Sequence, residues 1–234
     1  MTMLMGDEIA AANLTDWRKL AQGLHARYRI ADFASGARFL VSIGEAGDAA
    51  GHHPKATIGA GHVDLELVSR DAIYDDGTTA HTVEWVTQKD IDLARRITEI
   101  AAEHGLRADP AAVAMLELGL DAADPAMIAP VWAALLTGDP DSQGRGTPGD
   151  EIRDAGSRVP HLWFGDPPRD GSSEQRFHLE VYVAPEAAES RIAAAVAAGG
   201  TVLDASGAPS LTVIADQEGN QGVLCVDASA ASSV

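Results

Sequence analysis

Alternation and spacing of apolar residues in the first hundred positions predict strands interleaved with helices. Val63, Leu65 and Leu67 alternate with mainly polar neighbours, which is typical of a strand with one buried face. Residues 17–30 indicate a pair of short strands, and residues 82–86 indicate a return strand after a turn. These segments predict a small antiparallel sheet.

Two helices are predicted around these strands. Asp32 is a typical N-cap, and the helix after it should end in the glycine-bounded stretch 47–51. The second helix is predicted over residues 90–104, with Thr87 as its cap and Gly105 after its end. The residues expected to face inward are Phe33, Ala37, Leu40 and Val41 in the first helix, and Ile91, Ala94, Ile97 and Ala101 in the second. The order α-β-β-α-β-β-α implies an α+β fold with the helices on one face of the sheet.

The later half of the chain contains a weak internal repeat. Residues 115–120 register on residues 178–183, and a helical stretch begins a few positions after each segment. A short polar break near residues 107–110 separates the repeat from the first part. We therefore expect two domains, at residues 1–106 and 107–234.

Composition narrows the class of protein. With 46% apolar and 22% charged residues the chain should be globular, and a formal charge of −18 disfavours nucleic acid and anionic lipid as partners. Its single cysteine cannot form an internal disulfide. No signal peptide is recognisable in residues 1–12, and no apolar run approaches the ~18 residues of a membrane span. We expect a cytoplasmic protein that does not contact membranes.

The densest chemical signal is the run from Asp48 to His52, His53 and Pro54. Imidazole gains and loses protons near neutral pH, so two positioned rings can protonate one atom while deprotonating another. A polar, solvated loop is the alternative reading. Pro54 biases His53 towards extended geometry, which should turn the two rings apart. A metal site is disfavoured because adjacent histidines diverge and no further ligand follows at a familiar spacing.

Several segments together resemble pterin-4a-carbinolamine dehydratase over residues 6–105. They are Trp17, residues 30–33 leading into a helix, the acidic-x3-His-His-Pro run 48–54, and the Thr-x-x-Asp-x-x-Leu-Ala sequence 87–94. The resemblance implies dehydration of 4a-hydroxytetrahydropterin to quinonoid dihydropterin, with a pterin as substrate and no cofactor. On the family pattern, the acid/base groups and their carboxylates are His52, His53, Asp48 and Asp90, with Pro54 beside them in the substrate pocket. For Asp90, the alternative is a first-turn carboxylate favoured by the helix dipole.

One position departs from this family pattern. The third active-site histidine falls on Arg70, which stays protonated and cannot act as a base near neutral pH. An arginine there could still bind a pterin carbonyl or an acid. His62 and His81 are candidate substitutes, with surface strand histidines as the alternative reading.

The second part resembles the glyoxalase/bleomycin-resistance family over residues 111–228. The similarity lies in residues 176–183, 199–202 and 216–220. It implies paired βαβββ modules whose sheets curl around a shared pocket. His178 matches a metal-ligand position, but Met115 and Val223 stand where further ligands would be needed, so we expect no metal.

A small organic ligand is the expected occupant of the second domain. The candidate contacts are His178, His161, Trp163 and Trp132, and the alternative for the tryptophans is a place in the core. The leading hypothesis is a dehydratase fused to a glyoxalase-like domain, assembled as a homodimer or homotetramer. The alternatives are a dehydratase-fold scaffold that has lost turnover, and a glyoxalase-like ligand-binding or resistance protein.

Overall fold

The computed structural model describes residues 1–75, 77–139, 141–142, 151–153, 159–165, 176–217 and 219–227. The chain divides into two compact units, the first built mainly from Met1–Ala114 and the second from Met115–Tyr182 and Glu189–Cys225. Within the described ranges, no helix has the length and apolar character needed to cross a bilayer.

The first unit confirms the α+β class and adds strands to the predicted order. Its elements are α1 (Gly6–Ala11), β1 (Arg18–Leu20), β2 (Gly23–Arg29), α2 (Phe33–Ala50), β3 (Lys55–Gly59), β4 (His62–Leu67), β5 (Ser69–Asp75), β6 (Ala80–Trp85), α3 (Gln88–Glu103) and β7 (Arg107–Ala108). The main sheet has the order β1-β2-β4-β3 with β7 beside β2, and β5 and β6 form a separate antiparallel hairpin. Strand β7 carries the first sheet past residue 106.

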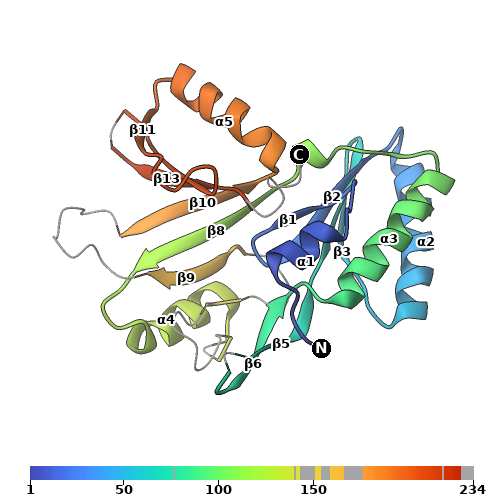
Figure 1. Cartoon of the computed structure of the whole chain (residues 1–234), viewed down its shortest axis with the longest axis horizontal. Helices are drawn as coiled ribbons and strands as arrows, with labels where there is room; N and C mark the ends of the chain where they lie inside the picture. The colour runs from blue at the N-terminus through green and yellow to red at the C-terminus, as the bar shows by residue number, and fades with distance from the viewer. Residues whose placement is uncertain are drawn as a thin grey trace. The chain divides into compact units, whose positions relative to one another are not determined.

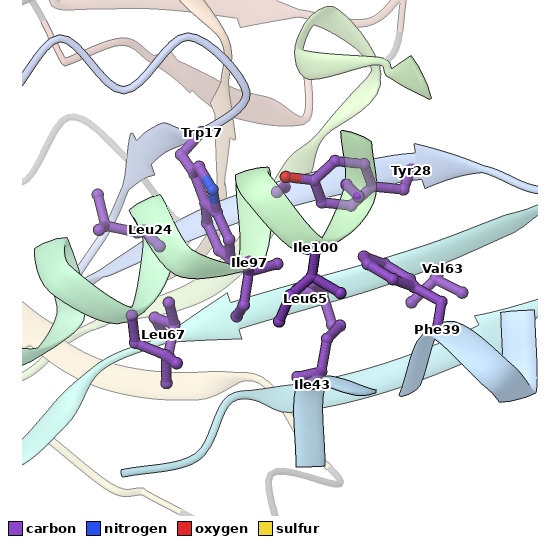
Figure 2. Packing of buried hydrophobic residues seen from close by; sticks show 14 of the residues in the cluster. Trp17, Leu24, Tyr28, Phe39, Ile43, Val63, Leu65, Leu67, Ile97 and Ile100 are labelled. Carbon is purple, nitrogen blue, oxygen red and sulfur yellow. The ribbon is translucent and has the colours of Figure 1, made fainter. Parts of the chain in front are cut away.

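The core of this unit lies between the main sheet and helices α2 and α3, which lie side by side (Figure 1). Val63, Leu65 and Leu67 are buried, as their alternation predicts. Figure 2 shows Phe39 and Ile43 from α2 and Ile97 and Ile100 from α3 packed over strand β4, which carries these three residues. The Tyr28 and Phe39 rings meet edge to face with centroids 5.2 Å apart.

Helix α2 begins and ends as predicted but buries a different face. Asp32 accepts a hydrogen bond from the backbone N–H of Ser35 at 2.7 Å, and Gly51 ends the helix with φ of 60°. The buried residues are Gly36, Phe39, Ile43 and Gly47. Of the four residues predicted to face inward, Phe33, Ala37 and Val41 are exposed and Leu40 is partly buried.

The physical reason for this correction is the close approach of α2 to the sheet. A Cβ at Gly36 would lie 2.7 Å from both Ile30 Cδ1 and Ile58 Cδ1. A larger residue would push both isoleucine side chains away, so glycine lets α2 lie close to the sheet with the face that carries Phe39 and Ile43 turned inward.

Helix α3 follows the prediction closely. Thr87 is the N-cap, and Ile91, Ala94, Ile97 and Ala101 are all buried. Asp90 is buried on the same helix with 0% exposure, although a carboxylate is rarely found fully buried without partners. Its surroundings therefore bear on function.

The remaining elements lie mostly in the second unit: β8 (Ala114–Asp121), α4 (Pro125–Thr137), β9 (His161–Gly165), β10 (Phe177–Val183), α5 (Pro185–Ala197), β11 (Thr201–Asp204), β12 (Leu211–Ala215) and β13 (Gln221–Cys225). They build a sheet of order β11-β12-β13-β10-β8-β9, with α4 beside its β9 end (Figure 1). The first strand of each repeat pairs in parallel with a later strand of the same repeat, β8 with β9 and β10 with β13. This matches the expected repeat. The second module has the order βαβββ, from β10 through α5 to β13. In the first module, the described residues form β8, α4, β9 and an isolated bridge between Ile152 and Leu162.

Candidate active site

The His-His loop begins where helix α2 ends. Gly51 in the left-handed conformation turns the chain, and the backbone N–H of His52 donates to the carbonyl of Gly47 at 3.1 Å. This turn sends the two imidazoles to different carboxylates. His53 Nε2 lies 2.9 Å from Asp48 Oδ1, one helical turn back along the chain.

His52 reaches the buried carboxylate of helix α3. Its Nε2 lies 2.7 Å from Oδ1 of Asp90, a residue 38 positions away. The His52 side chain is 15% exposed and that of Asp90 is 0% exposed. With the Asp90 carboxylate ionised, Nε2 would be the donor, and Nδ1 of a neutral ring would be the basic nitrogen.

The second oxygen of Asp90 is held by three donors. Oδ2 accepts from Ser69 Oγ at 2.7 Å, from the backbone N–H of Thr87 at 2.8 Å and from Thr87 Oγ1 at 3.1 Å. The Ser69 and Thr87 hydroxyls also lie 2.8 Å apart. Sequence reasoning missed Ser69, because one serine at the start of a strand carries no signal of its own.

The two His–carboxylate pairs differ in solvent contact. The side chains of His53 and Asp48 are 55% and 82% exposed, so water screens their attraction. The His52–Asp90 pair is withdrawn from water, where a hydrogen bond to a charged group is stronger and better oriented. The structure therefore brings three predicted site residues, Asp48, His52 and His53, to the C-terminal end of α2 and joins His52 to the fourth, Asp90.

Arg70 lies in an irregular stretch of β5. The register of β5 on β6 shifts between Ser69 and Ala72, both of which are buried, while Arg70 and Asp71 between them are exposed. Arg70 Nε lies 3.7 Å from Glu84 Oε1 on β6. The guanidinium is thus in contact with the hairpin partner strand.

The remaining predicted residues of the first unit are more scattered. His81 stacks on Tyr74 in the β5–β6 hairpin, with ring centroids 6.4 Å apart. His62 lies on β4 with Nε2 3.6 Å from Asp64 Oδ2. Pro54 follows His53 and is half-buried before β3. None of these observations joins His62 or His81 to the His52–Asp90 pair.

In the second unit, His178 covers a glycine. A Cβ at Gly119 would clash with Nε2 and Cε1 of the His178 ring, so glycine lets the ring lie where it does. The ring also meets Trp163 edge to face, with centroids 5.4 Å apart. Trp132 instead packs against the hydrophobic core formed with α4, which is the alternative the sequence left open.

Two carboxylates near His178 escaped the sequence analysis. Glu117 is buried with Oε1 3.6 Å from Nδ1 of His161, and Glu180 accepts a hydrogen bond from the Tyr182 hydroxyl at 2.9 Å. Burial, and then the charge of Glu117, raise the pKa of Glu180. Burial likewise raises the pKa of Tyr182, and it raises that of Cys225 to about 12. The thiol is therefore protonated and unreactive at neutral pH.

Comparison with known proteins gives two family matches. The model for "Pterin 4 alpha carbinolamine dehydratase" matches residues 3–100, and that for "Glyoxalase-like domain" matches residues 117–225. A putative pterin-4-alpha-carbinolamine dehydratase of Koribacter versatilis is 31% identical over 40% of this chain and 87% of its own. One from Thermosynechococcus vestitus is 32% identical over 40% of this chain and 87% of its own.

One solved structure also aligns with part of this chain. The crystal structure of a transcriptional coactivator/pterin dehydratase from Brucella melitensis covers 43% of this chain and 99% of its own. Sequence identity is 22% and the TM-score is 0.36.

Proposed function

Because the chain belongs to the pterin-4-alpha-carbinolamine dehydratase family through its first hundred residues and carries a glyoxalase-like domain after them, we propose that its first unit dehydrates a 4a-hydroxytetrahydropterin to the quinonoid dihydropterin. His52 and His53 are the acid and base of this reaction. The observation that carries the proposal is the 2.7 Å contact between His52 Nε2 and the buried Asp90 carboxylate.

The chemistry needs one proton delivered and one removed. The bond between C4a and its hydroxyl oxygen breaks, and the oxygen leaves as water with a proton from an imidazolium. The other imidazole takes a proton from the adjacent ring nitrogen, whose electron pair forms the new double bond to C4a. Atoms and charge balance with two histidines alone, and the step requires no oxidant or cofactor.

The two carboxylates serve these rings in different ways. Asp90 fixes the ring plane and tautomer of His52 and stabilises the imidazolium when it forms. Asp48 does the same for His53 in contact with water, where side chains reorient more freely. Arg70, His81 and Pro54 are proposed to line the pterin side of the site.

The test is the rate at which the carbinolamine absorbance disappears. We expect the protein to accelerate this loss and His52→Ala to reduce kcat by about 10²- to 10⁴-fold, the usual contribution of a general acid or base. The matched control is His104→Ala, which removes an exposed imidazole bonded to Ser42 on the same unit. A wild-type rate no faster than buffer would exclude the dehydratase function.

A second candidate function is a ligand-binding scaffold of dehydratase fold without turnover. It is favoured by Arg70, which replaces the expected third imidazole and contacts Glu84. The scaffold would bind pterin in calorimetry yet leave the carbinolamine rate unchanged. Arg70→His should then create turnover, and it should change stability by less than about 1 kcal/mol because the Arg70 side chain is 58% exposed and its Nε lies 3.7 Å from Glu84.

For the second unit, the proposal is a metal-free site for a small organic ligand at His178, His161 and Trp163. Support comes from the His178–Trp163 contact and from Met115 and Val223, which are poor ligands for a hard metal. Stoichiometric zinc or nickel that is lost in His178→Ala would refute it. We further propose a cytoplasmic location, which agrees with a sequence that holds one cysteine. We also propose that the protein assembles as a homodimer or homotetramer.

A further inference from the structure

We propose that Ser69 is a positioning residue for His52, acting through the carboxylate of Asp90. The role rests on the proposed dehydratase function and adds to it a residue that the spacing of the sequence does not single out. Ser69 is 2% exposed and donates its hydroxyl proton to Asp90 Oδ2 at 2.7 Å.

The two carboxylate oxygens of Asp90 make different contacts. Oδ2 accepts from Ser69 and twice from Thr87, and Oδ1 faces His52 Nε2. Rotating the carboxylate would break all these contacts together. The donors on Oδ2 therefore determine where Oδ1 lies, and Oδ1 determines the orientation of the imidazole.

Thr87 is needed to cap helix α3 whether or not it positions Asp90, whereas Ser69 has no part in that cap. Thr87 and Asp90 form the capping box of helix α3, so their contact follows from helix formation alone. Ser69 comes from strand β5, outside that helix, and its hydroxyl lies within hydrogen-bonding distance of both Asp90 and Thr87.

The backbone of β5 is shaped around this contact. Ser69 and Ala72 are both buried although they are three residues apart, an odd spacing that regular strand alternation would place on opposite faces. The register shift between them turns both inward. A hydroxyl brought inward in this way meets the one buried carboxylate that contacts the proposed acid/base group.

Two measurements on the full-length protein separate positioning from mere structural support. The first is the side-chain ¹⁵N–¹H NMR signature of His52, which reports the tautomer without any need for turnover. Wild type should show the Nε2–H form, and Ser69→Ala should show a mixture of both tautomers. The second is kinetics: kcat should fall about 10- to 100-fold, the loss typical when the hydrogen-bond partner of a metal-bound histidine is removed, with KM changed less than twofold.

Control variants match these changes. Thr98→Val removes a half-buried hydroxyl that accepts from Trp17 Nε1 at 3.2 Å, and should lower stability while leaving kcat and the His52 signal unchanged. Should Ser69→Ala not fold, Ser69→Cys against Ser69→Thr tests the same contact. Cysteine is a weak donor and should lower kcat, whereas threonine keeps the hydroxyl and should keep wild-type values.

The possible failures are distinguishable. If wild type lacks turnover but Ser69→Ala still alters the His52 tautomer, the dehydratase function is wrong and the positioning role stands. If turnover is present and Ser69→Ala changes neither kcat nor the tautomer, the positioning role is wrong and the dehydratase function stands.

Discussion

Gly47 and His53 are in contact across the end of helix α2. A Cβ at Gly47 would lie 2.7 Å from Cδ2 of the His53 ring and 3.0 Å from the backbone oxygen of His52. The helix end and the His-His loop are therefore fitted to one another, and glycine is the only residue that leaves both in place.

Gly47→Ala should consequently reduce dehydratase activity while most of the fold remains. The methyl group displaces the His52 carbonyl, and overpacking of this kind destabilises by about 1–3 kcal/mol. Gly44→Ala is the control, because nothing lies within 4 Å of its Cβ position in the same helix. It should stabilise by about 0.5–1 kcal/mol. Urea unfolding and the carbinolamine assay measure both effects; equal behaviour of the two variants would disprove the contact.

Asp90→Asn should be far more damaging than Asp48→Asn. An asparagine at position 90 cannot satisfy three donors and the His52 N–H in the same orientation, so the imidazole changes tautomer. We expect kcat to fall by about 10²- to 10⁴-fold and stability by about 1–3 kcal/mol.

The exposed partner pair provides the comparison. Asp48 is 82% exposed at its side chain, and Asp48→Asn should change stability by less than about 1 kcal/mol. Chemical denaturation and initial rates report both quantities. A larger loss of stability in Asp48→Asn than in Asp90→Asn would contradict the assignment of the buried pair.

The sequence predicted which segments of the first unit form helices and strands better than it predicted which side of each is buried. The alternation in β4 and the spacing in α3 arise from large apolar residues, so the pattern is readable. The inward face of α2 instead depends on Gly36 and Gly47, which carry no hydrophobic signal and are buried because the helix approaches its neighbours closely. Strand β5 was not predicted because its register shift interrupts the alternation.

The candidate site was recognised through its motif rather than through its contacts. Asp48, His52 and His53 lie close in sequence, so their proximity could be anticipated. The meeting of His52 with Asp90 is a tertiary contact that no local pattern encodes. Ser69, Glu117 and Glu180 show the same limit, because a single buried polar residue has no periodicity to reveal it.

Glu180 gives the second unit a pH-dependent stability. Burial raises its pKa above the ordinary value of 4.5, so the folded state favours the protonated carboxyl. Its contribution is fully present below that ordinary value and is lost as pH rises through the higher, folded-state value. Glu180→Gln keeps an acceptor for Tyr182 and removes the charge, so it should melt at a higher temperature than wild type at neutral pH.

Calorimetry at two pH values checks this. The gap between Glu180→Gln and wild type should close below pH 4.5. Glu189→Gln, an exposed change on α5, should show no gap at either pH. A gap of the same size at both pH values would mean that the charge of Glu180 is not its cause.

Gly119→Ala should displace the His178 ring and weaken binding of the small organic ligand proposed for the second unit. The added methyl group would clash with the tip of the imidazole, so we expect the edge-to-face contact with Trp163 to be lost. Near-ultraviolet circular dichroism reports the change around Trp163. Gly222→Ala on β13 is the control, because its Cβ would lie 3.6 Å from the Leu179 carbonyl, an ordinary contact. If both variants retain the wild-type spectrum, His178 does not depend on Gly119.

The register shift in β5 places two exposed residues between two buried ones. Ser69 and Ala72 are tied to the interior, whereas Arg70 and Asp71 bulge outward between them. Substitutions at position 70 should therefore leave the buried contact between Ser69 and Asp90 in place. In the proposed dehydratase, the side chain at position 70 can then differ while the residues that hold Asp90 stay the same.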